Sequence, residues 1–244
     1  MIISHENKYI FVELPATGTS AISEELCRNY GGERILNKHS TYPSFLAQAT
    51  SDEKQYFSFS CIRNPMDVAV SQYFKLKTDH FKFEEPHYLA ERNLLNKIVY
   101  SHRRLDQLRF IRDNDADFAT YFMKFFRLPY SSWAVLSHHH LDFVIRFEQL
   151  HDGLEAALAK TRLTLVRPLP VRNKTGDRER NFLDYYPENI RARAKKIFQP
   201  FMFEWGYEFP SDWGKVENSL LNNYWYHFLN VGRRFYWTRL KHDL

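Results

Sequence analysis

The chain contains little cysteine, glycine or proline for its length. Its 244 residues include two cysteines (Cys27 and Cys61), eight glycines and ten prolines. Two cysteines exclude a disulfide framework and suit a reducing compartment. The low glycine and proline content, together with 44% hydrophobic residues, excludes a low-complexity or disordered chain. A chain of this length forms one large domain or two small ones.

Long apolar segments are also absent from the sequence. No window of about 18 apolar residues exists, so we predict no membrane span. The first residues, MIISHENKYIFVEL, lack the basic segment and apolar run of a signal peptide. Lys and Arg, 34 in all, exceed the 29 Asp and Glu by five. This excess favours an anionic ligand such as a nucleotide, an acidic glycan, a nucleic acid or a lipid headgroup.

Apolar segments that alternate with helical ones predict the fold class. We expect strands at 8–14, 34–36, 56–62 and 141–147. We expect helices at 21–30, 42–49, 65–75, 88–112, 115–127, 148–160, 187–205 and in the tail 215–244. Strand–loop–helix units of this kind predict an α/β fold, with a P-loop-like parallel sheet flanked by helices and helical insertions. We predict one domain over 1–210, and 211–244 as its helical, aromatic and basic C-terminal extension.

The loop after the first predicted strand is short and rich in hydroxyl groups. A strand that leads through a tight turn into a helix N-terminus directs several backbone N–H groups to one place, which favours an anion. The nucleoside-triphosphate motif GxxxxGK[ST] is absent from the sequence. The segment alone fits an ordinary strand–helix turn equally well. Its residues are Pro15, Ala16, Thr17, Gly18, Thr19 and Ser20.

A second polar motif follows the strand predicted at 56–62. Arg63 lies at the carboxyl end of that strand, where ligands bind in open parallel sheets. Ser71 comes eight residues later, about two turns along the next helix. The guanidinium can bind a phosphate while the hydroxyl donates a hydrogen bond. An arginine at a sheet edge and a serine on a helix face are the structural alternative.

Together the two motifs resemble those of the PAPS-dependent sulfotransferases, especially the carbohydrate-type branch (PAPS is 3′-phosphoadenosine 5′-phosphosulfate). That family has a P-K-T-G-[GT]-[TS] loop and, roughly fifty residues later, V-R-[ND]-P-x-[DE]-R-x-x-S. Three further segments are similar in the family's order, so the likeness spans roughly 8–210. They are Lys38-His39-Ser40-Thr41; Arg146-Phe147-Glu148 with Leu150; and Asn173-Lys174-Thr175, followed by Tyr185-Tyr186 and Phe203 to Tyr207.

The resemblance implies sulfuryl transfer from PAPS to a hydroxyl or amine of a carbohydrate or small metabolite, with release of adenosine 3′,5′-bisphosphate. It implies that the first loop binds the 5′-phosphosulfate and that Arg63 and Ser71 bind the 3′-phosphate. Golgi members of the family have a membrane anchor and lumenal disulfides. This sequence has no predicted membrane span and only two cysteines, so a cytoplasmic enzyme is expected. No metal and no nucleic-acid partner are expected, and a homodimer is possible. The implied nucleotide-binding residues are 15–20, Arg63, Ser71, Asn173, Lys174 and Thr175.

The sequence departs from the family at Ala16, where the family has a lysine that assists the leaving phosphate. Another cation has to replace it, or the chain is a weakened protein that binds PAPS or its product without efficient transfer. The candidates for that cation are Lys38, Lys75 and Lys174. We predict His39 as the general base, because imidazole titrates near neutrality and the family has a histidine or glutamate in this region. His80 and Glu84 are the alternatives, and Glu148 is interpreted as structural.

Two other clusters have weaker interpretations. The adjacent residues His138, His139 and His140 cannot all face one ion, so metal binding is not expected. The tail combines aromatic residues with arginines and a lysine. It can pack on the domain, form a dimer contact or touch a membrane surface, and packing is the preferred interpretation.

Overall fold

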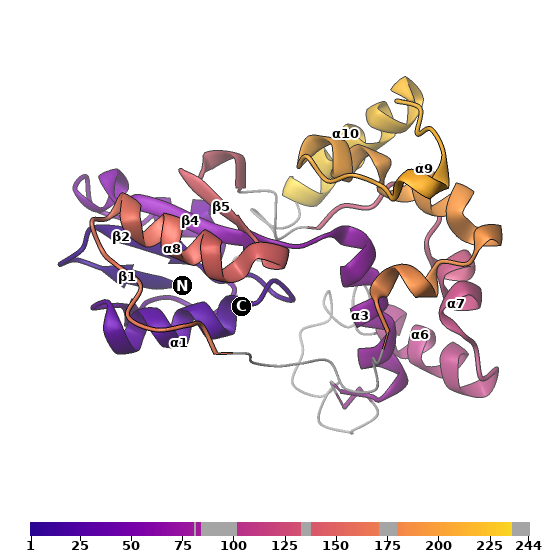
Figure 1. Ribbon diagram of the computed structural model, residues 1–244, viewed down its shortest axis with the longest axis horizontal. Helices are drawn as coiled ribbons and strands as arrows, with labels where there is room; N and C mark the ends of the chain where they lie inside the picture. Colours follow the sequence, from indigo (N-terminus) through magenta and orange to yellow (C-terminus); the bar gives the residue numbers. More distant parts are fainter. Residues whose placement is uncertain (81, 84–101, 133–137, 171–179, 236–244) are drawn as a thin grey trace. The chain divides into compact units, whose positions relative to one another are not determined.

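The computed structural model describes residues 1–80, 82–83, 102–132, 138–170 and 180–235 (Figure 1). The chain forms two compact units. The first contains residues 1–64, 131–174 and 227–244, and the second contains 65–130 and 175–226. Each unit is described by itself. The predicted division of the chain after residue 210 stays a prediction.

The first unit is built on a five-stranded mixed sheet of order β3-β1-β2-β4-β5. Strands β2, β4 and β5 are parallel, while β1 is antiparallel to both β2 and β3. The α/β prediction is therefore confirmed, but a wholly parallel sheet is wrong, because a short N-terminal hairpin adds an antiparallel edge. The strands are β1 (Ile2–Ser4), β2 (Tyr9–Val12), β3 (Glu33–Arg34), β4 (Phe57–Ile62) and β5 (Phe143–Arg146).

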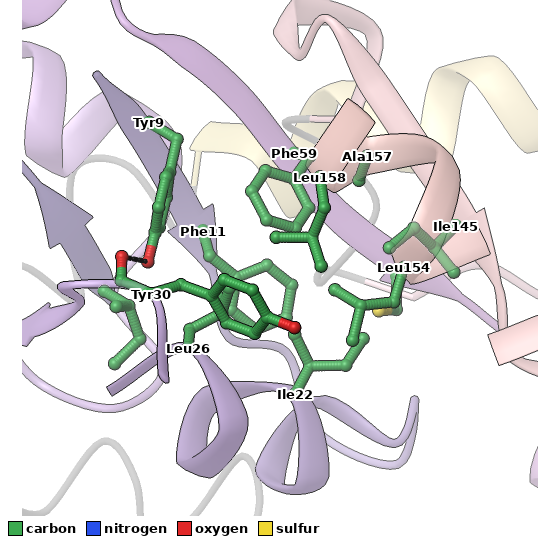
Figure 2. Packing of buried hydrophobic residues seen from close by; sticks show 12 residues of the cluster. Tyr9, Phe11, Ile22, Leu26, Tyr30, Phe59, Ile145, Leu154, Ala157 and Leu158 are labelled. Atoms are coloured by element: carbon green, nitrogen blue, oxygen red, sulfur yellow. Dashed lines mark hydrogen bonds between the residues drawn. The ribbon is translucent and has the colours of Figure 1, made fainter. Parts of the chain in front are cut away.

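Helices cover both faces of this sheet, because successive side chains of a strand point to opposite sides. Helices α1 (Thr19–Asn29) and α8 (Leu150–Lys160) pack on one face. Helix α2 (Tyr42–Leu46) packs on the other. Figure 2 shows the first of these two cores, in which Tyr9, Phe11 and Phe59 of the strands meet Ile22, Leu26, Leu154, Ala157 and Leu158 of the helices.

The second unit is helical among its described residues and has a core of aromatic rings. Tyr73 contacts Phe118 and Tyr121, and Phe122 stacks on Phe198. The Tyr186 hydroxyl donates a hydrogen bond to the carbonyl oxygen of Met66, 3.0 Å away. The helices are α3 (Pro65–Lys77), α6 (His102–Asp113), α7 (Phe118–Phe125), η5 (Phe182–Tyr185), α9 (Glu188–Glu204), η6 (Ser211–Trp213) and most of the first half of α10 (Leu220–Phe235).

Most predicted elements are present with shifted ends. The strand expected at 34–36 is the two-residue β3, and the helix expected at 148–160 begins as the 3-10 turn η4 (Phe147–Gln149) before α8. Most of the helix expected at 88–112 lies outside the described residues, and α6 covers its last part. Strand β1 was not predicted, because three residues are too few for a periodic pattern. Of the helices in the described ranges, none has the length and apolarity that a membrane crossing requires.

Candidate anion-binding site

The three parallel strands end together at one edge of the sheet. Val12 of β2 pairs with Ser60 of β4, and Ile62 of β4 pairs with Arg146 of β5. The segments that leave these strands are therefore neighbours. They are the loop 13–18, the pair Arg63 and Asn64, and η4 with its first residue Phe147. This is the edge at which open α/β sheets place their ligands.

The loop between β2 and α1 is closed by its own hydroxyl groups. The Thr17 and Thr19 hydroxyls both donate to the carbonyl oxygen of Leu14, over 3.0 Å and 2.8 Å. Each hydroxyl has one proton, so in this arrangement neither donates to a ligand. Ala16 and Gly18 have positive φ angles of 65° and 76°, which turn the chain sharply into the helix.

The N-terminus of α1 is well suited to hold an anion. Its N-cap residue is Gly18, which has no side chain to cap the helix, and the first turn contains no acidic residue. The first amides of a helix have no partner within the helix, and the helix dipole makes this end positive. The loop thus offers an anion the hydrogen bonds of backbone amides and the positive end of the helix dipole.

Gly18 also lets the loop approach the segment after β5 closely. A Cβ atom at this position would lie 2.9 Å from Phe147 Cδ2 and 2.9 Å from Leu150 Cδ2. A side chain of any kind would therefore push the loop away from η4 and α8. Glycine is required here both by the backbone angle and by this contact.

Arg63 links the ends of all three parallel strands. Its guanidinium donates a hydrogen bond to the carbonyl oxygen of Ala16, 3.2 Å away, and its Cζ lies 4.2 Å from the centre of the Phe147 ring. The stacked ring fixes the plane of the guanidinium and costs it little solvation. A permanent positive charge is thereby held beside the 15–20 loop.

Lys38 and His39 approach the same segment from the stretch that follows β3. The Lys38 ammonium donates to the Ser20 hydroxyl over 3.2 Å, at the first turn of α1. The His39 Nδ1 lies 3.2 Å from the carbonyl oxygen of Glu13. Partial burial lowers the pKa of His39, against the opposing effect of the hydrogen bond to Glu13. The imidazole is therefore mostly neutral at pH 7, which is the state that a general base needs.

A buried carboxylate anchors the start of the loop. Glu13 is 1% exposed and accepts hydrogen bonds from the Ser23 hydroxyl, over 2.6 Å, and from the Met1 ammonium, over 2.8 Å. The Arg34 guanidinium lies 3.5 Å from the same carboxylate. Burial alone would raise the pKa of Glu13, but these hydrogen bonds and charges outweigh it and lower the pKa. Glu13 thus stays ionised and ties β2 to α1 and β3.

The structure brings some of the predicted site residues together in the first unit. These are residues 15–20, Lys38, His39 and Arg63. Three others lie in the second unit: Ser71 is buried on α3, Lys75 is partly exposed on the same helix, and His80, which follows the helix, is exposed. The residues Asn173, Lys174, Thr175 and Glu84 lie outside the described residues.

Sequence reasoning missed two residues of the site. Phe147 was placed in the predicted strand and in the family-like segment Arg146-Phe147-Glu148, but it was given no role at the site. Glu13 was assigned to the predicted strand that contains Tyr9. Its charge within this apolar segment was the one signal that it has a special role. Glu148, which was interpreted as structural, accepts a hydrogen bond at Oε1 from the backbone N–H of Asn64 over 2.8 Å.

The three adjacent histidines do not form a metal site in the structure. His138 is buried, with Nε2 3.0 Å from the carbonyl oxygen of Cys61, while His139 and His140 are exposed. Across the described ranges, no three His, Cys, Asp or Glu side chains are grouped to hold an ion.

Comparison of the chain with models of known protein families, with curated proteins and with solved structures found no match. The geometry of the loop and the motifs in the sequence are therefore the observations from which a function can be inferred. Within the first unit they converge on one feature, a helix N-terminus approached by Arg63 and Lys38.

Proposed function

We propose that the protein is a PAPS-dependent sulfotransferase whose β2–α1 loop acts as a P-loop-like cradle for the 5′-phosphosulfate. The main support is the juxtaposition of Arg63 and Lys38 with the 15–20 loop at the carboxyl edge of the parallel strands. The sulfotransferase-like motifs supply the chemical class, because an anion cradle alone does not distinguish sulfate from phosphate. The assignment of Ser71, Asn173, Lys174 and Thr175 to the nucleotide stays part of this proposal.

Lys38 is the side chain that we propose in place of the missing loop lysine. Its ammonium is held by Ser20, four residues after Ala16, on the same turn that presents the helix amides. Of the other candidates, Lys75 belongs to the second unit and Lys174 lies outside the described residues. A charge from Lys38 would stabilise the phosphate that leaves when the sulfuryl group departs.

In the proposed reaction the S–O bond of the donor breaks and a bond from sulfur to the acceptor oxygen or nitrogen forms. The adenosine 3′,5′-bisphosphate leaves with the electron pair, and the acceptor loses its proton to the imidazole of His39. By analogy with phosphoryl transfer, the transition state is loose, so charge stabilisation and alignment matter more than covalent catalysis. The acceptor is a hydroxyl or amine of a carbohydrate or small metabolite. The two free cysteines support a reducing, cytoplasmic setting.

A second candidate function is nucleotide binding without efficient transfer. The observation that favours it is Ala16, a neutral residue at the point where the family has a lysine. Both candidates require the same anion site, but only the first requires turnover.

Two measurements test the proposal. Calorimetric titration with adenosine 3′,5′-bisphosphate should show binding that is weaker in Arg63→Ala and unchanged in Lys54→Ala. Lys54 is a suitable control because it is exposed in η1 (Glu53–Gln55), before the start of β4 and hence at the opposite edge of the sheet. Incubation with sulfur-labelled PAPS and a panel of sugars and amines should then give a labelled acceptor. Binding without any label transfer would favour the second candidate, and no binding at all would exclude both.

A further inference from the structure

His39 contacts the β2–α1 loop through one nitrogen of its ring. Its Nδ1 lies 3.2 Å from the carbonyl oxygen of Glu13, the first residue after β2. A carbonyl oxygen only accepts hydrogen bonds, so this contact is favourable when Nδ1 carries the proton. Among the residues that the structure describes, none forms a hydrogen bond with Nε2 of His39, and the residue keeps an exposed surface. Nε2 is therefore the nitrogen with a lone pair available for a proton.

The surroundings of His39 keep its ring neutral at pH 7. Partial burial lowers its pKa, and the ammonium groups of Lys38 and Met1 lower it further. The carbonyl and the carboxylate of Glu13 act in the opposite direction and do not outweigh these effects. A neutral imidazole has a single N–H, so the hydrogen bond to Glu13 selects between its two tautomers.

The carbonyl that holds His39 belongs to a residue whose side chain is firmly held. The Glu13 carboxylate is buried and accepts hydrogen bonds from the Ser23 hydroxyl of α1 over 2.6 Å and from the Met1 ammonium over 2.8 Å. The Arg34 guanidinium of β3 lies 3.5 Å from it. Contacts from three parts of the chain thus hold Glu13 in place, which leaves its carbonyl little freedom to move.

The next residue along the chain holds the anion-binding loop. The carbonyl oxygen of Leu14 accepts the hydrogen bonds of the Thr17 and Thr19 hydroxyls. The α-carbons of Glu13 and Leu14 are about 3.8 Å apart, as across any trans peptide bond. The ring of His39 and the loop are therefore attached to adjacent residues, so a single peptide unit sets their spacing.

We propose that Glu13 is a positioning residue, which holds His39 in the tautomer with the proton on Nδ1 and so makes Nε2 the atom that takes the acceptor's proton. The role of Nε2 rests on the proposed function, in which His39 is the general base. When the proton moves to Nε2, the acceptor oxygen or nitrogen keeps the electron pair of the broken bond and forms the new bond to sulfur. The ring becomes a cation with an N–H at both nitrogens, and its hydrogen bond to the Glu13 carbonyl is retained.

Nitrogen NMR of the full chain with isotope-labelled histidine tests the tautomer directly, because a protonated and an unprotonated ring nitrogen differ strongly in chemical shift. At pH 7, His39 should have a protonated Nδ1 and an unprotonated Nε2. The spectrum of His39→Gln identifies its signals among those of the 11 histidines. His138 is an internal control, because its Nε2 lies 3.0 Å from the carbonyl oxygen of Cys61 and should carry a proton. A neutral His39 with its proton on Nε2 would overturn the proposal, whether or not transfer is observed.

Two variants test the role of the Glu13 side chain. Ser23→Ala removes one buried hydrogen bond from the carboxylate, and Glu13→Gln removes its charge. Both should lower the population of the Nδ1–H tautomer. They should also lower kcat, by about threefold and at least about tenfold, with a smaller change in the affinity for adenosine 3′,5′-bisphosphate, because they misalign the base and not the nucleotide.

Ser4→Ala is the matched control for Ser23→Ala. Both serines are fully buried, but Ser4 pairs with Tyr9 at the start of β2, at the opposite edge of the sheet, and its hydroxyl accepts a hydrogen bond from the backbone N–H of Asn7. The control should therefore lose a similar amount of stability in urea unfolding and keep both the tautomer and kcat.

These measurements separate a positioning role from a structural one. Equal changes of tautomer and kcat in Ser4→Ala and Ser23→Ala would overturn the proposal, and so would a folded Glu13→Gln with the tautomer of the original chain. If Glu13→Gln does not fold, Ser23→Ala and the spectrum of the original chain decide. The expected tautomers without any transfer by the original chain would refute the sulfotransferase and confirm that Glu13 fixes the ring of His39.

Discussion

The guanidinium of Arg63 donates a hydrogen bond to the carbonyl oxygen of Ala16, although 47 residues separate them in the chain. This contact fastens the loop that follows β2 to the end of β4. Since the same guanidinium stacks on Phe147 after β5, one cation connects all three parallel strand ends. Arg63 is therefore a structural support of the loop, and in the proposed function it is also a source of charge for the anion.

Replacing Arg63 should weaken nucleotide binding. Arg63→Ala removes a charge-assisted hydrogen bond, and the affinity for adenosine 3′,5′-bisphosphate should fall by roughly 1.5–3 kcal/mol. Arg63→Lys retains the charge but not the planar stack on Phe147, so its affinity should be intermediate. Isothermal titration calorimetry measures both, with Lys54→Ala as the control. Equal affinity in Arg63→Ala and the original chain would remove Arg63 from the site.

A methyl group at Gly18 should disturb the loop more than one at Gly31. Both glycines have positive φ angles, 76° and 63°. At Gly31 the closest atom to an added Cβ is Glu6 Oε2, the end of a flexible side chain, so Gly31→Ala should cost about 1 kcal/mol. Gly18→Ala meets the packed side chains of Phe147 and Leu150 and should cost roughly 2–4 kcal/mol in unfolding free energy. Urea unfolding compares the two, and equal losses would show that Phe147 and Leu150 yield freely.

The sequence predicted the parts of the fold that depend on local pattern. Apolar segments marked β2, β4 and β5, and the turn residues marked the loop before α1. Pro65 marked the start of α3, as proline does at a first helical position. The antiparallel edge was not predictable in this way, because β1 has three residues and β3 has two.

The candidate site was predicted in its composition but not in its contacts. Residues 15–20 and Arg63 were marked by their motifs, yet the inward bonds of the Thr17 and Thr19 hydroxyls depend on the turn geometry at Leu14. Lys38 was one of three equivalent candidates until the path of the chain after β3 placed it at Ser20. Contacts between segments far apart in the chain follow from tertiary packing, which a single sequence does not express.

Glu13 should make the stability of the protein depend on acid pH. Its pKa is lowered in the folded state, so it contributes stability above the ordinary glutamate range. That contribution should be lost as the pH falls through the unfolded and then the folded pKa. Glu13→Gln leaves the Met1 ammonium and Ser23 with a neutral partner and should destabilise the protein by about 3 kcal/mol at pH 7.

Urea unfolding at several pH values tests this dependence. The difference between Glu13→Gln and the original chain should shrink as the pH is lowered below the ordinary glutamate range. Glu155→Gln is the control, because Glu155 is an exposed carboxylate on α8. A difference that does not change with pH would mean that Glu13 acts through packing and not through its charge.

His39 should determine the acid limb of the rate profile. Since its pKa is lowered, the base stays neutral to a lower pH than an ordinary histidine. The value of kcat/KM should therefore fall only below the usual histidine range. His39→Ala should reduce kcat by about 10²- to 10⁴-fold and leave donor affinity almost unchanged. His151→Ala, an exposed histidine on α8, should retain full activity; activity that survives in His39→Ala would transfer the role to His80 or Glu84.

The last prediction concerns the cation that replaces the family's loop lysine. If Lys38 supplies this charge, Lys38→Ala should lower kcat by at least tenfold, with a smaller effect on donor affinity, because the charge acts mainly on the leaving phosphate. Ala16→Lys in the original chain should also lower kcat. The new ammonium would lie in the same loop as the one held at Ser20 and repel it, and a lysine would have to adopt the φ of 65° found at Ala16.

The double variant Ala16→Lys, Lys38→Ala distinguishes this explanation from general damage to the loop. With the repelling partner removed, the lysine at position 16 should restore part of the turnover lost in Lys38→Ala, so the two substitutions should be strongly non-additive. Steady-state kinetics with PAPS measures kcat and KM for all four proteins of the cycle. A rise in kcat for Ala16→Lys alone, at unchanged donor affinity, would contradict the role of Lys38. It would show instead that the natural chain is a nucleotide-binding protein whose transfer is limited by the missing charge at Ala16.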